Sequence, residues 1–199
     1  SPPTSDLPLM NTPTHLVINW SLARGSGHDF PLSAVLLGSV APDIPLYLLS
    51  IGGGLYYTWG KGLPASQAAE KIWGDLYFND AWWISLHNLL HAPLVVVTLL
   101  ALLWFVLGKA AFLSHWASWF FLSCLVHTLI DIPVHHNDGP LLLWPLDWKT
   151  RFNSPVSYWH PGYYGIPCMI FEGCLFVWLT ARLAGPRLMQ WFASTPPVE

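Results

Sequence analysis

The sequence has few charged residues. Asp, Glu, Lys and Arg make up 10% of its 199 residues, whereas a soluble domain carries about 25%. So few charges cannot coat the surface of a compact domain in water, which argues against an ordinary cytosolic enzyme. The formal net charge of -3 also lacks the basic excess of a nucleic-acid-binding protein. We therefore expect no nucleic-acid partner.

The sequence is also poor in cysteine. Its three cysteines form no CxxC motif, because Cys124 and Cys174 lie inside apolar runs and Cys168 just precedes one. This spacing favours simple packing over a disulfide framework. The first nine residues lack the basic start of a signal peptide and are rich in proline. We expect an N-terminal extension at 1–9, one helical membrane domain at 10–187 and a C-terminal tail at 188–199.

Apolar residues are abundant, at 53% of the chain. Four stretches approach the roughly 20 helical residues that cross a bilayer: Pro31–Tyr57, Ala81–Gly108, Ala111–Val134 and Gly162–Ala184. Proline interrupts the first of them around Asp43, which predicts two half-helices or a re-entrant segment. A short helix is predicted at Thr12–Ala23. The predicted fold is all-α, a polytopic helical membrane protein with about four membrane-embedded helices, one broken by proline, and a short N-terminal helix.

Ionisable side chains recur inside these apolar stretches. His87 and His91 are four residues apart near the start of the second stretch, and His127 and Asp131 are four apart near the end of the third. Residues at this spacing share one helical face. If the two stretches are antiparallel and joined near Gly108, both pairs lie at the same membrane depth. The pattern then predicts that three histidines and one aspartate converge.

Two further residues extend this group. His15 lies on the predicted N-terminal helix, and Asp43 lies in the proline-flanked break, where irregular backbone commonly lines a cavity. Imidazole and carboxylate ligands suit Zn²⁺ best, and Mn²⁺ or Fe²⁺ as the carboxylate share rises. Six ligands exceed the needs of one catalytic zinc, so either two ions bind or some residues only support the ligands. The predicted metal ligands are His15, Asp43, His87, His91, His127 and Asp131.

Simpler interpretations remain open for each residue alone. A single histidine on an apolar face is more often a hydrogen-bonded core residue than a ligand. Three roles are open for Glu172, which lies inside the last apolar stretch. It is a catalytic acid or base, a residue that supports a metal ligand, or a hydrogen-bonding anchor between helices. Asp43 and Asp131 are the other candidate catalytic residues.

At these residues the sequence resembles the predicted membrane-bound metal-dependent hydrolases of the bacterial inner membrane. The resemblance covers most of the chain from Met10 to Leu146 and rests on a few segments. These are the opening Met10-Asn11-Thr12-Pro13-Thr14-His15, the Ala41-Pro42-Asp43 break, the pairs His87/His91 and His127/Asp131, and Leu143-Trp144-Pro145-Leu146. It implies a divalent metal held by these His and Asp residues, in a helical arrangement similar to that of zinc-dependent phospholipases. It also implies a bacterial inner-membrane location.

The chain departs from the family pattern around the double histidine. The common form has an arginine beside the first histidine and a threonine and a serine flanking the second, whereas this chain has Asn88, Leu90 and Ala92. Loss of the arginine removes a candidate phosphate clamp. Metal binding survives such a change more readily than catalysis does.

Three classes of function follow. The first is a metal-dependent hydrolase that acts at the lipid bilayer on a lipid-like or phosphorylated substrate. The alternative is a non-catalytic accessory subunit of a larger membrane complex, in which the metal site is structural and the Trp-rich surface packs against other subunits. A metal or proton transporter ranks last, because its polar residues would have to continue through both halves of the membrane.

Overall fold

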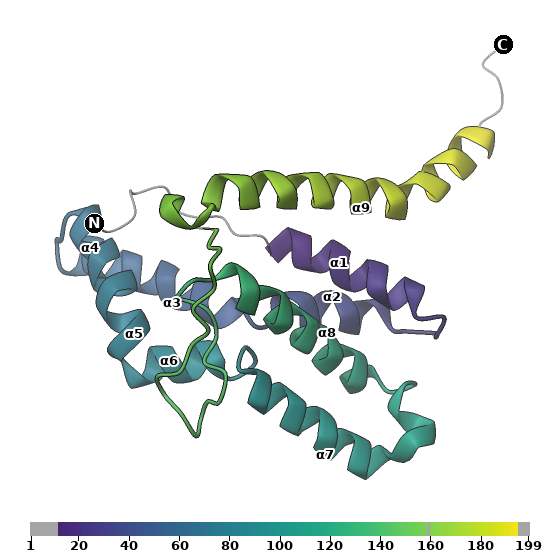
Figure 1. The fold of residues 1–199 in the computed structure, drawn as a ribbon, viewed down its shortest axis with the longest axis horizontal. Helices are drawn as coiled ribbons and strands as arrows, with labels where there is room; N and C mark the ends of the chain where they lie inside the picture. Colours follow the sequence, from purple (N-terminus) through teal and green to yellow (C-terminus); the bar gives the residue numbers. More distant parts are fainter. Residues whose placement is uncertain (1–11, 159, 195–199) are drawn as a thin grey trace.

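The computed structural model describes residues 12–158 and 160–194, and every regular element among them is a helix (Figure 1). This confirms the all-α prediction. The predicted extension at 1–9 and the last five residues of the predicted tail lie outside the described residues.

Three helices among the described residues are long and apolar enough to cross a membrane. They are α7 (Pro93–Phe112), α8 (Trp116–Asp131) continued by the short η3 (Ile132–Val134), and the first 21 residues of α9 (Gly165–Ser194). A fourth candidate consists of α2 (Leu32–Val40) and α3 (Ile44–Leu55) continued by η1 (Tyr56–Gly60), with a bend of 45° between the two parts. The prediction of about four membrane-embedded helices, one of them broken, is confirmed.

The break between α2 and α3 has a local cause. Pro42 has no backbone N–H, and the N–H of Asp43 donates to the carbonyl of Val40 at 3.1 Å. In a continuous helix Asp43 would instead donate to Ser39, four residues earlier. The break therefore leaves the Ser39 carbonyl free to accept another donor and places Asp43 at the bend.

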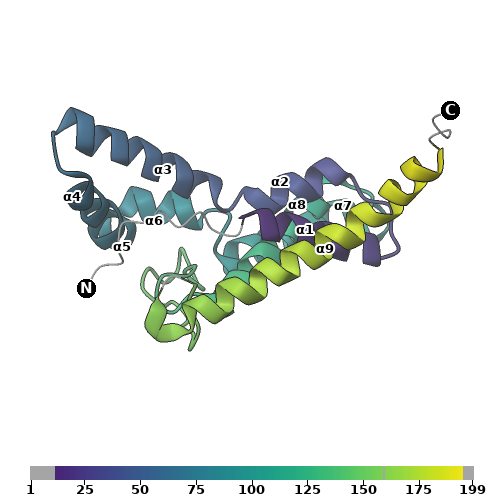
Figure 2. The ribbon, with the colours of Figure 1, turned by 90° about the horizontal axis from the view of Figure 1, so that it is seen from above.

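The helix α1 (Thr12–Gly25), predicted from the sequence, packs against α2 and α9. On its other side, α2 packs closely on α8 (Figures 1 and 2). A Cβ added at Gly38 would lie 2.2 Å from the carbonyl oxygen of Phe120 and 2.9 Å from Cβ of Ser123. Glycine is required there because the backbones of α2 and α8 approach too closely for a side chain.

The helices α7 and α8 pack side by side as an antiparallel pair (Figure 1). Helical geometry in α7 is interrupted at Gly108, whose combination of φ 71° with ψ 166° suits glycine alone among common residues. The chain turns there, as the sequence predicted. The start of α7 and the end of α8 consequently lie at the same end of the pair.

The second predicted apolar stretch, Ala81–Gly108, is not one helix. It divides into α6 (Ala81–Asn88) and α7, separated by a turn at residues 89–92. Pro93 explains the division, because the residue before a proline is pushed out of helical geometry, and Ala92 is extended (φ -76°, ψ 122°). The prediction that His87 and His91 share one helical face is therefore wrong: His87 lies on α6 and His91 in the turn.

A smaller lobe lies against α3 (Figure 2). It contains α4 (Ala65–Ala69), η2 (Glu70–Leu76), α5 (Tyr77–Asn79) and α6. Asp80 is the N-cap of α6: its carboxylate accepts hydrogen bonds from the backbone N–H groups of Trp82 and Trp83, at 2.9 and 3.1 Å. This cap fixes the direction of the helix that leads to His91.

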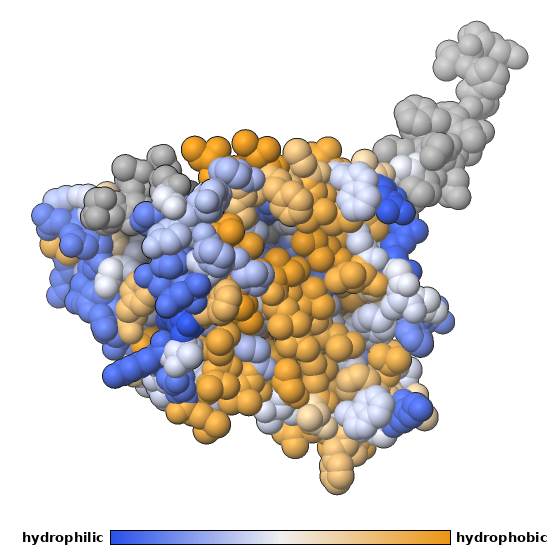
Figure 3. All heavy atoms as spheres, viewed as in Figure 1, coloured by the Kyte–Doolittle hydropathy of each residue, from blue (hydrophilic) through white to orange (hydrophobic). Residues whose placement is uncertain are grey.

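Among its described residues, the loop between α8 and α9 has η3 and η4 (Pro161–Tyr163) as its helical elements. Asn88 ties this loop to α6, because its amide oxygen accepts from the N–H of Leu141 at 2.9 Å. Arg151 donates to the Gly139 carbonyl, and its guanidinium lies 5.1 Å from the centre of the Tyr77 ring. The loop thus rests on α5 and α6. Figure 3 shows a broad apolar band across α7, α8 and α9, with polar residues gathered around the loop and the smaller lobe.

Candidate metal centre

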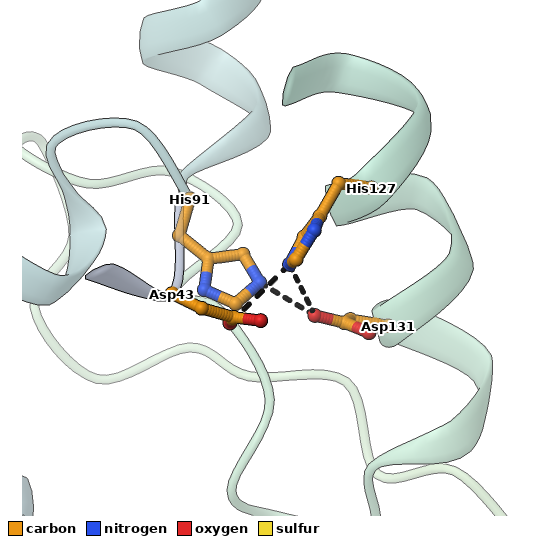
Figure 4. Close-up of side chains that lie close together, drawn as sticks. All are labelled: Asp43, His91, His127 and Asp131. Carbon is orange, nitrogen blue, oxygen red and sulfur yellow. Dashed lines mark hydrogen bonds and ion pairs between the residues drawn. The ribbon is translucent and has the colours of Figure 1, made fainter. Parts of the chain in front are cut away.

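Four side chains from three separate segments lie close together (Figure 4). Asp43 comes from the break between α2 and α3, His91 from the turn before α7, and His127 and Asp131 from α8. One ligand atom of each lies within 4.8 Å of the ligand atoms of the other three. His91, His127 and Asp131 are buried, whereas Asp43 is only partly covered.

The break between α2 and α3 fixes the orientation of His127. Its Nδ1 lies 2.7 Å from the free carbonyl oxygen of Ser39. A carbonyl oxygen only accepts, so Nδ1 carries a hydrogen and donates it. In the neutral ring this leaves a lone pair on Nε2, which lies 3.4 Å from Oδ1 of Asp43 and 3.1 Å from Oδ2 of Asp131. A lone pair facing two carboxylates is unfavourable unless a proton or a metal cation lies between them.

Asp131 is the shared acceptor of the group. Its Oδ2 lies 2.7 Å from Nε2 of His91, in addition to its approach to His127. Its Oδ1 lies 3.1 Å from Nε2 of His15 on α1. A carboxylate 3% exposed needs such partners, because burying an unpaired charge is costly.

His15 therefore lies beside the four-residue group. Its ring stacks on that of His127, with centres 3.9 Å apart and an angle of 22° between the ring planes. The structure brings five of the six sequence-predicted ligands together in this way: His15, Asp43, His91, His127 and Asp131.

The sixth, His87, points to a different partner. Its Nε2 lies 3.3 Å from the Tyr77 hydroxyl, and its ring packs edge-on against His91, 4.7 Å away. Burial lowers the pKa of His87 well below its usual value, so the ring is neutral. His87 therefore packs against His91 and lies outside the four-residue group.

Glu172 also lies outside the four-residue group. It is 6% exposed on α9 and lines a cavity with Thr14 and His15. Its link to the candidate centre runs through His15, which touches Asp131.

Comparison with known proteins identifies the family of this chain. Residues 10–195 match the family described as YdjM inner membrane protein. The chain belongs to the YdjM inner membrane protein family. The match, together with the apolar helices, identifies it as an integral protein of the inner membrane. None of the curated proteins and none of the solved structures compared with it gives a match.

The donor set in this YdjM-family chain fits a divalent metal. Two imidazoles and two carboxylates suit Zn²⁺, whose bonds of about 2.0–2.2 Å put tetrahedral ligand atoms about 3.3–3.6 Å apart. Nε2 of His127 and Oδ1 of Asp43 are separated by 3.4 Å, within this range, whereas the distances from Oδ2 of Asp131 to His127 and His91, 3.1 and 2.7 Å, are shorter. The buried group of Asp43, His91, His127 and Asp131 could therefore hold a metal ion.

Some contributors at the centre were not identified from the sequence. The hydroxyl of Thr12 donates to Oδ2 of Asp43 at 2.7 Å and lies 2.8 Å from the Tyr47 hydroxyl. Thr12 belongs to the opening motif that carries the family resemblance, so its position there was the available signal. The Ser39 carbonyl gives no such signal, because any residue at position 39 supplies one.

A second polar cluster lies under the loop. The Tyr77 hydroxyl donates to the carbonyl of Asp138, and burial raises the pKa of Tyr77 to about 12. Nδ1 of His135 lies 3.2 Å from Oδ1 of Asp138. These contacts hold the loop over α5 and α6.

Proposed function

We propose that this protein is a metal-dependent hydrolase that acts at the membrane on a lipid-like or phosphorylated substrate. The observation that carries the proposal is the orientation of His127, whose Nδ1 bonds the Ser39 carbonyl while Nε2 faces two carboxylates. A ring used only for packing would not need its second nitrogen among acceptors. A bound metal, with Zn²⁺ the best fit to these donors, would supply Lewis acidity and lower the pKa of a bound water.

We assign different roles to these residues because they differ in burial. His91, His127 and Asp131 are fixed by several contacts each and suit the permanent binding of an ion. Asp43 is less buried, with its side chain 16% exposed, and Thr12 holds its Oδ2 in place. We assign Asp43 as the general base that takes a proton from an attacking water at Oδ1, and Asp131 as the second candidate. Glu172, which lines a cavity together with His15, is assigned a supporting role.

Metal analysis of purified protein tests the first half of the proposal. We expect bound metal in the wild type and almost none in the double variant His127→Ala, Asp131→Ala. The matched control is His115→Ala, Asp147→Ala, which removes the same residue types from positions outside the candidate centre and should retain metal. Equal, near-zero metal in wild type and double variant would overturn the proposal. Release of phosphate or fatty acid from a panel of phospholipids by metal-loaded protein then tests the hydrolase assignment.

A second candidate is a non-catalytic membrane subunit with a structural metal site. Asn88, which stands where the resembling family commonly has arginine, is fully buried and bonds Ile84 and Leu141. Its role is to hold the fold, and it cannot clamp a phosphate. Purification in mild detergent separates the candidates: migration in a large complex without turnover supports the subunit, and an active single protein supports the hydrolase.

A further inference from the structure

A cavity of about 300 Å³ lies where α1, α8 with η3, and α9 come together. Most of its lining is apolar, including Leu129, Phe171 and Leu175. Its polar lining includes Thr14, His15 and Glu172. None of the four residues of the candidate centre is among the residues that line the cavity, and His15 links the two because it lines the cavity and contacts Asp131.

The exposure of the lining residues gives the cavity a direction. Leu129 and Phe171 are 52% and 69% exposed, whereas Thr14, His15 and Glu172 are buried. Leu129 and Phe171 lie on the membrane-spanning parts of α8 and α9. The open side therefore faces lipid tails, and the closed end is polar.

At the closed end, a nitrogen atom of His15 can accept a hydrogen bond from a ligand. Nε2 of His15 lies 3.1 Å from a carboxylate oxygen of Asp131, which can only accept, so Nε2 carries the ring hydrogen in the neutral form. Nδ1 of His15 is then an acceptor, and it is buried without a hydrogen-bond partner among the described residues. A hydroxyl group would satisfy it, whereas a carboxylate or an ester oxygen would not.

The volume limits the size of the occupant. Ligand cavities range from about 300 to 1,000 Å³, so this one lies at the small end and suits one hydrocarbon chain. We propose that the cavity binds a single-chain lipid with a free hydroxyl, of the monoacylglycerol type, which enters from the bilayer between α8 and α9. Its hydroxyl lies against His15 and Glu172, and its chain leaves between Leu129 and Phe171. The further assignment of this lipid as substrate or product of the neighbouring centre rests on the proposed function.

The polar end should determine selectivity. A chain that moves from the bilayer into the cavity exchanges one apolar surrounding for another, so chain length contributes little. A ligand without the hydroxyl leaves His15 unpaired at a cost of about 1–3 kcal/mol, which is on the order of tenfold in affinity.

Photolabelling in a bilayer tests the proposal. The full chain is placed in nanodiscs of phosphatidylethanolamine and phosphatidylglycerol with a monoacylglycerol that carries a diazirine on the first carbons of its chain, next to the ester, which the proposal places inside the cavity. We expect labelling to concentrate on residues 129–134 and 168–175. Excess monoacylglycerol should compete about tenfold better than the methyl ester of the same chain, which lacks the hydroxyl.

Two variants of α9 supply the matched comparison. Leu175→Trp fills the cavity and should reduce labelling by about tenfold or more, whereas Val177→Trp, 65% exposed on the same helix, should change it less than about twofold. Leu129→Trp, at the exposed mouth, provides a blocking variant that adds no bulk to the core. A midpoint of thermal unfolding in detergent equal to that of the wild type shows that each variant is folded.

The outcomes separate this inference from the proposed function. Equal labelling of Leu175→Trp and Val177→Trp, or uniform labelling of all exposed apolar residues, would overturn the cavity assignment while leaving the metal centre intact. The expected labelling in a protein that binds no metal would refute the proposed function and leave the lipid cavity standing.

Discussion

At the scale of single residues, the candidate centre depends on groups that hold ligands as well as on the ligands. Thr12 fixes one oxygen of Asp43, and the Ser39 carbonyl fixes one nitrogen of His127. Such supporting hydrogen bonds set the orientation of a ligand and its basicity. The affinity for metal should therefore respond to residues that never touch the ion.

Thr12→Val tests this expectation. Valine keeps the shape of threonine but cannot donate to Oδ2 of Asp43, so we expect metal affinity to fall about 10–100-fold. Thr98→Val is the matched control, because the Thr98 hydroxyl bonds only the carbonyl of Leu94 within α7 among the described contacts. Isothermal titration with Zn²⁺ measures both variants. Equal affinities would show that Asp43 does not need Thr12.

The pair His135–Asp138 makes a prediction about pH. Burial raises the pKa of Asp138, but the hydrogen bond and charge of His135 outweigh it and hold this pKa below its usual 3.8. Burial lowers the pKa of His135, but the Asp138 hydrogen bond and the charges of Asp131, Asp138 and Asp43 raise it above 6.5. The stabilisation from Asp138 is present above pH 3.8, and that from His135 is present below pH 6.5. The stabilisation from His135 is lost as the pH rises through the raised pKa of His135.

Asp138→Asn should therefore destabilise the protein most near pH 5.5. We expect the midpoint of thermal unfolding in detergent to fall by about 2–4 °C for each kcal/mol lost, with a smaller difference at pH 9. The exposed Asp29→Asn serves as control. A loss that is the same at both pH values would contradict a charged pair.

At the scale of elements, the contact between α2 and α8 positions the centre. Gly38 lets the two backbones approach, and Ser39, the next residue, then reaches His127. A wider separation would remove that hydrogen bond and also move Asp43, which follows the same helix.

Gly38→Ala should consequently affect both stability and metal binding. The added Cβ would meet backbone atoms of α8, and overpacking of this kind costs about 1–3 kcal/mol. Gly54→Ala in α3 is the matched control, because nothing lies within 4 Å of a Cβ there. Thermal unfolding and metal content are measured on both variants. A Gly38→Ala protein with wild-type values would show that α2 and α8 can separate without disturbing the centre.

At the scale of the whole molecule, the apolar surface of the described residues faces the bilayer. Leu102, near the middle of α7, is 57% exposed, and Leu146, in the loop after α8, is 83% exposed. A soluble protein would tolerate charge equally well at both positions. In a membrane protein the two positions differ, because only α7 crosses the hydrocarbon.

Leu102→Lys should therefore reduce accumulation in the inner membrane, with a cost of about 2.5–3.5 kcal/mol at a helix centre. Leu146→Lys should leave accumulation unchanged. Quantitative blotting of membrane fractions measures both. Equal accumulation of the two variants would place α7 outside the hydrocarbon.

How much the sequence predicts depends on whether a feature is local. The bend at Pro42, the turn at Gly108 and the helix α1 follow from residues at those positions, and the structure confirms all three. The convergence of His91, His127 and Asp131 followed from the antiparallel arrangement of two helices. The turn before Pro93 was missed because the apolar run continues across it, and this error placed His87 with His91. Thr12 and Ser39 act across 31 and 88 residues of sequence, which no local pattern reveals.

The role of the Ser39 carbonyl bears on how such a chain can diverge over time. The acceptor belongs to the main chain, so no codon change at position 39 deletes it, and only the size of the residue there is constrained. The sensitive position is Pro42. If its replacement let the helix continue across the bend, the Ser39 carbonyl would accept from the N–H of Asp43 instead of from His127. Substitution of the candidate ligands would abolish the proposed metal binding at once, whereas substitution of this proline would weaken it through the main chain while every ligand is retained.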